Sequence, residues 1–200
     1  MDAEKLSQKL IFPLDSGGVD GCRGGWIFSS LAAGRFNWQF LPDLVSVKQL
    51  LRQEAVLLAD IPIGLPHKKY RVRKCDREAR KNLQPSRAQS VFSPPSLRSL
   101  KKGSHREANA ENVREIGRGI SIQAWNLAAK IREAAAWKSP PALRESHPEL
   151  CFRFLEGAPA KFSKKTGEGR RERVALLKQF DSEVENSLSK ARQKVGSALA

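Results

Sequence analysis

The sequence predicts an α/β domain in which an antiparallel three-stranded meander is joined to a buried parallel strand. Three strand-like segments, residues 16–20, 26–31 and 35–41, are separated only by short glycine turns, so neighbouring segments are expected to pair in antiparallel fashion. The later run AVLLADI, residues 55–61, is almost continuously apolar, as is typical of a central parallel strand covered on both faces. The mostly helical stretch 66–137 predicts a helical insertion.

Residues 35–41 give the clearest strand pattern in the chain. Phe36, Trp38 and Phe40 alternate with polar residues, and this period of two predicts a strand with one buried face. After Pro42, apolar residues at helical spacing predict a helix that carries Leu44, Val47, Leu50 and Leu51.

The stretch after the apolar strand is interpreted as helices separated by loops. The basic run 67–81 predicts a helix entered through a loop, and the Pro- and Ser-rich residues 84–97 predict a loop. Residues 105–116 predict a polar helix. Residues 120–137 predict the longest helix of the chain, with a buried stripe formed by Ile122, Trp125, Leu127, Ala128, Ile131 and Ala135.

The last third of the chain begins with a short predicted strand at residues 143–146. Pro148 suits the first position of a following helix. A second basic run, residues 161–173, is expected to be a loop that leads into a helix ending at Phe180. The remaining residues predict a weakly amphipathic helix.

The domain organisation expected from these elements is a single domain. The domain covers residues 16–180 and contains the helical insertion at about 66–137. Residues 1–15 and 181–200 are expected to be terminal extensions.

Two aspartates follow predicted strands. Asp20 stands before the glycine-rich turn of GGVDGCRGGW, and Asp60 ends the apolar run 55–61. Ligands gather at the carboxyl ends of parallel strands, so the two carboxylates converge if their strands are neighbours. The alternatives are structural: Asp-Gly is a common hairpin dipeptide, and Asp60 can act as a cap before Pro62.

Two further acids flank His147 in the segment ESHPE. Glu145 ends the predicted strand, and Glu149 lies in the first turn of the helix that Pro148 begins. Glu149 has an alternative role there, because an acid in the first turn stabilises a helix through its dipole. His147 alone is more readily explained as a structural hydrogen-bonding residue.

The charge of the chain favours a polyanionic partner. The formal net charge is +15 over 200 residues, which suits binding to nucleic acid.

No stretch is long and apolar enough to span a membrane, and the N-terminus has no signal-peptide pattern. Three widely spaced cysteines fit free thiols in a reducing compartment, so we expect a cytoplasmic protein. The expected phosphate contacts are Arg23, Lys68, Lys69, Arg71, Arg73, Arg77, Lys164, Lys165, Arg170 and Arg171.

Acids at strand ends within a basic chain indicate phosphoryl chemistry on nucleic acid. Carboxylates without a cysteine or histidine cluster suit Mg²⁺ or Mn²⁺, which activate water and stabilise the leaving oxygen of a phosphodiester. Other chemistries fit less well. The sequence has no CxxC zinc pattern and no P-loop, and the adjacent Ser146 and His147 have no positioned acid to complete a catalytic triad.

Several motifs together resemble the domain-of-unknown-function 429 family, whose members are predicted ribonuclease-H-like nucleases. These motifs are GVDGCRGGW, LLADIPIGLP, CDREAR, SVFSPP, GRGISIQ, ESHPE and the SKKT…R run, in this order. The resemblance covers about residues 17–180. It implies a ribonuclease-H-like fold, with catalytic acids at Asp20, Asp60 and Glu145, the same three as metal ligands, and Glu149 as an assisting ligand.

The chain differs from that family after residue 180. Family members generally continue into a helix with an Asp-Asp-x-x-Asp-Ala pattern, whereas this chain reads DSEVENSLSKARQKVGSALA. The alternatives are a truncated or frameshifted chain, another acid in that role, or a copy that is not a working nuclease. A missing helix would leave one flank of the sheet uncovered, which favours a homodimer or reduced stability.

Three functions follow from these observations. The first is a Mg²⁺- or Mn²⁺-dependent nuclease that hydrolyses the phosphodiester bonds of nucleic acid. The second is a catalytically decayed nucleic-acid-binding protein on the same fold. The third is a phosphotransferase or phosphatase that acts on a small phosphorylated metabolite, since the glycines after Asp20 can approach a phosphate.

Overall fold

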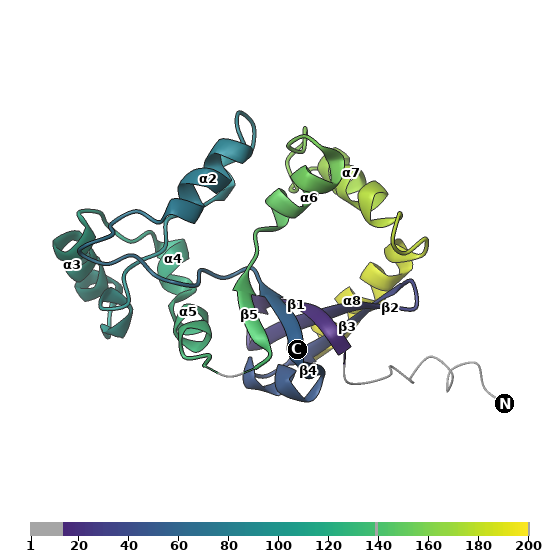
Figure 1. Cartoon of the computed structure of the whole chain (residues 1–200), viewed down its shortest axis with the longest axis horizontal. Coiled ribbons are helices and arrows are strands. Elements are labelled where there is room, and N and C mark those ends of the chain that lie inside the picture. Colours follow the sequence, from purple (N-terminus) through teal and green to yellow (C-terminus); the bar gives the residue numbers. More distant parts are fainter. Residues whose placement is uncertain (1–13, 139, 200) are drawn as a thin grey trace. The chain divides into compact units, whose positions relative to one another are not determined.

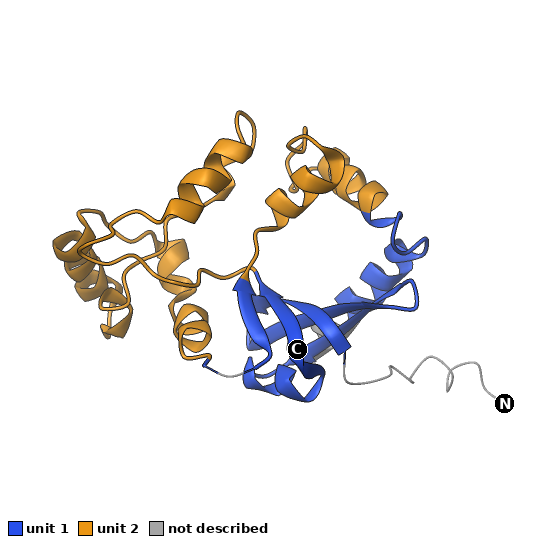
Figure 2. Ribbon diagram, viewed as in Figure 1, with its two compact units in different colours: residues 1–59, 138–144, 177–200 blue, residues 60–137, 145–176 orange. Residues whose placement is uncertain are grey.

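The computed structural model describes residues 14–138 and 140–199 (Figure 1). The chain divides into two compact units (Figure 2). The unit built from residues 1–59, 138–144 and 177–200 is called the sheet unit below, and the unit built from residues 60–137 and 145–176 is called the helical unit. Each is described separately.

The sheet has five strands in the order β3-β2-β1-β4-β5. β1 pairs with β2, and β2 with β3, in antiparallel fashion, whereas β1 and β4 are parallel. This mixed α/β arrangement confirms the predicted fold class and agrees with a ribonuclease-H-like sheet. The strands are β1 (Leu14–Cys22), β2 (Gly25–Ala32), β3 (Arg35–Leu41), β4 (Leu51–Ala59) and β5 (Ala142–Glu145).

The meander is built by tight turns and one close backbone approach. Ala33 and Gly34 connect β2 to β3 with φ angles of 49° and 69°, and two residues with positive φ are the hallmark of the type I′ hairpin turn. At the start of β2, a side chain on Gly25 would collide with the carbonyl oxygen of Leu41 on β3. The next residue, Trp26, is fully buried. This part of GGVDGCRGGW therefore has a packing role.

The segment between β3 and β4 differs from the predicted helix. It forms a short 3-10 helix, η1 (Val45–Gln49), and Leu51 already begins β4, four residues before the predicted strand start. Asp43 accepts hydrogen bonds of 2.8 Å from the backbone N–H and the hydroxyl of Ser46, which tightens the turn. Leu44 and Val47 are fully buried. Their apolar spacing therefore reflects two side chains that pack into the core from a short 3-10 turn, and not a regular α-helix.

The helical unit contains the helices α2 to α6 and most of α7. The described helices are α2 (Lys74–Asn82), α3 (His105–Ile116), α4 (Ile122–Asn126), α5 (Ala128–Ala135), α6 (Pro148–Glu156), α7 (Gly167–Leu177) and α8 (Val184–Leu199), with short 3-10 turns η2 (Ala88–Ser90) and η3 (Ser99–Lys101). α3 has the predicted bounds, because Ser104 caps its first turn and Gly117, at φ 78°, ends it.

The helix predicted over residues 120–137 is divided in the structure. Leu127, at φ −86° and ψ −2°, lies between α4 and α5 and interrupts the helical backbone. Ile122, predicted to be buried, is 59% exposed, whereas Ala128 and Ile131 are buried as predicted. The longest described helix is instead α8, with 16 residues. The basic run has the predicted form, because a loop leads into α2, which begins at Lys74.

Asp181 anchors residues 181–199, which were expected to be part of a terminal extension, to the sheet. Its carboxylate accepts hydrogen bonds from the backbone N–H of Phe36 in β3 at 2.9 Å and from the hydroxyl of Ser187 in α8 at 3.0 Å. The side chain is fully buried, and α8 packs against β3. Residues 181–199 therefore belong to the sheet unit.

The hydrogen bonds to Asp181 predict an acid-sensitive sheet unit. Hydrogen bonds from the backbone N–H groups of Phe36 and Glu183, and from the hydroxyl of Ser187, lower the pKa of Asp181. A lowered folded-state pKa stabilises the fold above the ordinary aspartate pKa of about 3.9, and this stability is lost as the pH falls through the folded-state value. Asp181→Ala is expected to lower the urea midpoint at pH 7 and to have less effect near pH 3. Glu185→Gln, an exposed change in the same segment, is the control, and an equal loss at both pH values would contradict the role of the carboxylate.

Candidate functional site

The strand register places Asp20 next to the pairing of Val19 with the last residue of β4. Asp20 lies in β1, one residue after Val19, and Val19 is the parallel partner of Ala59, the last residue of β4. Asp60 follows Ala59 directly in the chain. Asp20 is exposed and Asp60 is half-buried. The parallel pairing of β1 and β4 is the condition that the sequence argument required.

Arg73 is the centre of a buried ion cluster in the helical unit. Its guanidinium donates to Oδ1 of Asp76 from Nε at 3.1 Å and from an Nη at 2.6 Å, and it also donates to Oε1 of Glu145. The side chains of Arg73 and Asp76 are only 6% and 5% exposed. Burial alone would lower the pKa of Arg73, but its hydrogen bonds to Glu145 and Asp76 outweigh burial and raise it. Arg73 therefore remains a cation that compensates two carboxylates.

The same cluster fixes the chain just after Asp60. Oε2 of Glu145 accepts the backbone N–H of Ile63 at 2.8 Å, and Arg73 donates to the Ile63 carbonyl oxygen at 3.2 Å. Both polar backbone groups of Ile63 are thus held by side chains. The cluster joins three of the motifs noted in the sequence: LLADIPIGLP, CDREAR and ESHPE.

Two further arginines hold the SVFSPP loop. Arg80 of α2 donates to the carbonyl oxygen of Val91 and to the hydroxyl of Ser93, each at 2.9 Å. Arg118, in the GRGISIQ motif, donates to the carbonyl oxygen of Pro94 at 3.3 Å. Burial lowers the pKa of Arg118. These contacts give the CDREAR, SVFSPP and GRGISIQ motifs a shared structural role within the helical unit.

Glu149 forms a second buried ion pair. Its two carboxylate oxygens accept from Nε of Arg173 at 3.1 Å and from an Nη at 2.6 Å, and the two side chains are 5% and 9% exposed. Arg173 also donates to the carbonyl oxygen of Gly169 at 2.7 Å. Pro148 occupies the start of α6 as predicted, and Glu149 lies in its first turn. The pair links α6 to α7.

Two of the four predicted metal ligands form ion pairs with arginines. Glu145 and Glu149 both have arginine partners, and no group of three or more histidine, cysteine or acidic side chains suited to a metal ion is found among the described residues. Mg²⁺ is usually held by one or two carboxylates, together with waters and substrate phosphates. Asp20 and Asp60 supply two carboxylates, a number and a chemistry that suit Mg²⁺ or Mn²⁺. Glu145 and Glu149 are engaged by Arg73 and Arg173 in this arrangement.

Most of the predicted phosphate-binding residues are exposed. Arg73 is the exception, because it is enclosed in the ion cluster and is not available to a phosphate. Arg171 pairs with Glu168 at 3.4 Å, but both side chains are more than half exposed, so the pair leaves the arginine accessible. The exposed residues are Arg23, Lys68, Lys69, Arg71, Arg77, Lys164, Lys165, Arg170 and Arg171.

Comparison with protein families gives one match over most of the chain. A family model described as "Protein of unknown function (DUF429)" matches residues 18–198. The chain belongs to this family. No curated protein and no solved structure matches the chain. The match confirms the resemblance drawn from the motifs, and it places α8 within the DUF429 region.

The DUF429 match describes no activity, so the site rests on the geometry given above. Sequence reasoning missed Asp76, which pairs with Arg73, and Arg118, which interacts electrostatically with Asp76. Asp76 had a detectable pattern, because Arg73 and Asp76 have opposite charges at the i,i+3 spacing of one helical turn. Arg118 had no such pattern.

In the described part of the chain, no helix combines the length and apolar character needed to cross a membrane.

Proposed function

We propose that this DUF429 protein is a metal-dependent phosphodiester hydrolase that acts on nucleic acid. Asp20 and Asp60 are the carboxylates that bind Mg²⁺ or Mn²⁺. The observation that carries the proposal is the parallel register of β1 and β4, in which Val19 and Ala59 are partners and an aspartate follows each. Ligand sites of open α/β sheets lie at such strand ends.

Different residues of the chain have different roles in this proposed reaction. A bound Mg²⁺ or Mn²⁺ supplies charge stabilisation at the phosphoryl oxygens and lowers the pKa of a bound water. Asp20 and Asp60 hold the ion in place, and exposed lysines and arginines bind the phosphates of the nucleic-acid backbone. The net charge of +15 supports this assignment, because two carboxylates alone would repel a polyanion.

Glu145 and Arg73 act as positioning residues for this site. They hold the N–H and the carbonyl oxygen of Ile63, three residues after Asp60, and so restrict the backbone that carries the aspartate. Glu145 was predicted from the family resemblance as a catalytic acid and metal ligand. Its contacts support a role through the backbone instead.

A second candidate is a nucleic-acid-binding protein without turnover. The arginine partners of Glu145 and Glu149 favour it, because they leave two of the four predicted carboxylates out of a metal site. For either candidate we place the protein in the cytoplasm, since Cys22, Cys75 and Cys151 are free thiols, as is common in a reducing compartment.

Calorimetric titration with Mg²⁺ and with Mn²⁺ separates the two candidates. The wild type is expected to bind the ion, and Asp60→Asn is expected to lose this binding while keeping its urea midpoint. Glu54→Gln, an exposed change in β4, is the matched control and should bind as the wild type does. If the folded wild type binds neither ion, the hydrolase proposal fails. Salt-sensitive binding to oligonucleotides without turnover then supports the second candidate.

A further inference from the structure

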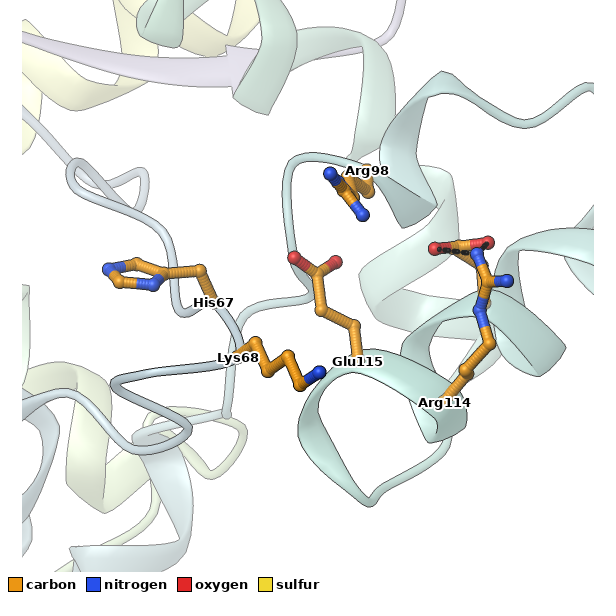
Figure 3. A pocket seen from close by; sticks show the side chains of 6 residues that line it. His67, Lys68, Arg98, Arg114 and Glu115 are labelled. Carbon is orange, nitrogen blue, oxygen red and sulfur yellow. Dashed lines mark hydrogen bonds and ion pairs between the residues drawn. The ribbon is translucent and has the colours of Figure 1, made fainter.

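A pocket of about 570 Å³ lies within the helical unit, and most of its lining side chains are charged (Figure 3). It contains none of the carboxylates assigned to the metal ion, and none of its acids was singled out in the sequence. The lining residues are His67, Lys68, Arg98, Glu111, Arg114 and Glu115.

The two acids of the pocket differ in their partners. Glu111 is bound through both oxygens by Arg114, at 2.7 and 2.5 Å, and the hydrogen bond from Arg114 lowers its pKa. By contrast, Oε2 of Glu115 is buried and accepts no hydrogen bond from the residues that the structure describes. A carboxylate oxygen can only accept hydrogen bonds, and burial without a donor is unfavourable. The pocket therefore presents an acceptor that an N–H donor of a ligand would satisfy.

The same pocket presents cations with unused hydrogen-bonding capacity. The side chains of Lys68 and Arg98 are exposed, and neither makes a hydrogen bond or an ion pair with the residues that the structure describes. In the view of Figure 3 the carboxylate of Glu115 appears between the guanidinium of Arg98 and the ammonium of Lys68. A ligand that fits must carry both N–H donors and an anionic group.

We propose that this pocket binds a guanine nucleotide. Guanine presents two adjacent N–H donors on its Watson–Crick edge, which match an acceptor-only carboxylate such as Glu115. Adenine and cytosine place a ring acceptor beside their amino group, and this acceptor would face the negative charge. The phosphate binds Arg98 and Lys68, as phosphates bind arginine and lysine elsewhere. The proposal does not depend on hydrolysis at Asp20 and Asp60.

The size of the pocket favours a nucleotide over a smaller ligand with the same charges. A free amino acid also joins an N–H donor to an anion, but it would leave most of 570 Å³ unfilled. Pockets of about 300–1,000 Å³ are typical of ligands of nucleotide size.

The test is calorimetric titration with GMP, IMP, AMP and inorganic phosphate. GMP is expected to bind most tightly, IMP more weakly because it lacks the amino group, and AMP and phosphate more weakly still. Glu115→Gln is expected to weaken GMP binding about tenfold or more and to reduce the preference for GMP over AMP, because a charge-assisted hydrogen bond is lost. Arg98→Ala is expected to weaken the binding of GMP, IMP and AMP alike.

Two changes on exposed positions of α3 serve as matched controls. Glu107→Gln and Arg106→Ala alter charge by the same amounts outside the pocket and are expected to bind GMP as the wild type does. Asp20→Asn is also expected to bind GMP normally, which keeps this result separate from the hydrolase proposal. Absent GMP binding, equal binding of all three nucleotides, or equal binding of GMP and phosphate would each overturn the guanine assignment.

Discussion

Asp20→Asn is expected to abolish metal-dependent cleavage of nucleic acid. The substitution keeps the size of the side chain but removes the charge that holds Mg²⁺ or Mn²⁺. Metal ions supply several kcal/mol of transition-state stabilisation, so we expect a loss of about 10³-fold or more in turnover. The measurement is the cleavage rate of labelled single- and double-stranded DNA and RNA, with and without each ion.

Asp15→Asn is the matched control for this experiment. Asp15 lies in the same strand, β1, but its carboxylate is 82% exposed and pairs with Arg52 at 3.3 Å. Its removal should leave cleavage unchanged, because an exposed ion pair contributes little. Binding of Asp20→Asn to the same oligonucleotides without metal should also persist. Full cleavage by Asp20→Asn would exclude this residue as a metal ligand.

Arg73→Met is expected to be the most destabilising single change in the helical unit. It removes the only cation that hydrogen bonds to Asp76 among the described residues and leaves that buried carboxylate without its ion-pair partner. Breaking a buried ion pair costs about 3–5 kcal/mol of unfolding free energy. Because the Glu145 side chain is 31% exposed, we expect a value near the lower limit, about 3 kcal/mol. Urea denaturation at pH 7 measures it.

A second substitution tests whether the buried charge causes this loss. Adding Asp76→Asn to Arg73→Met removes the charge of this carboxylate and is expected to recover part of the stability. Arg77→Met, an exposed change in the same helix α2, is the control and should remain within about 0.5 kcal/mol of the wild type. A single variant Arg73→Met as stable as Arg77→Met would show that the cluster is not needed for stability.

Local patterns predicted the elements whose residues are neighbours in the chain. The alternation in residues 35–41 gave β3 with its bounds, and Ser104 with Gly117 defines α3. No comparable capping or periodicity signal predicts the interruption of the helix at Leu127, because the alanines and leucine there favour a continuous helix. Element type was thus predictable where capping and periodicity agree.

The candidate site was predictable only in part, because partner choice depends on tertiary structure. The strand-end positions of Asp20 and Asp60 followed from the strand order and the apolar run. The arginine partners of Glu145 and Glu149 lie 72 and 24 residues away, and no local pattern identifies which cation meets which acid. The sequence therefore indicated which carboxylates have a structural or functional role. It did not distinguish metal ligands from ion-pair partners.

The anchoring of α8 by Asp181 has a consequence for synthesis of the protein on the ribosome. The hydrogen bond from Phe36 to Asp181 spans 145 residues, so β3 gains this contact only after the ribosome has added residue 181. The helical unit, whose segments all precede residue 177, can complete its contacts earlier. Contacts of such high sequence separation slow folding and leave strand surface exposed in the meantime. Nascent chains halted just before residue 181 should therefore need chaperones to protect β3, although all segments of the helical unit are already present.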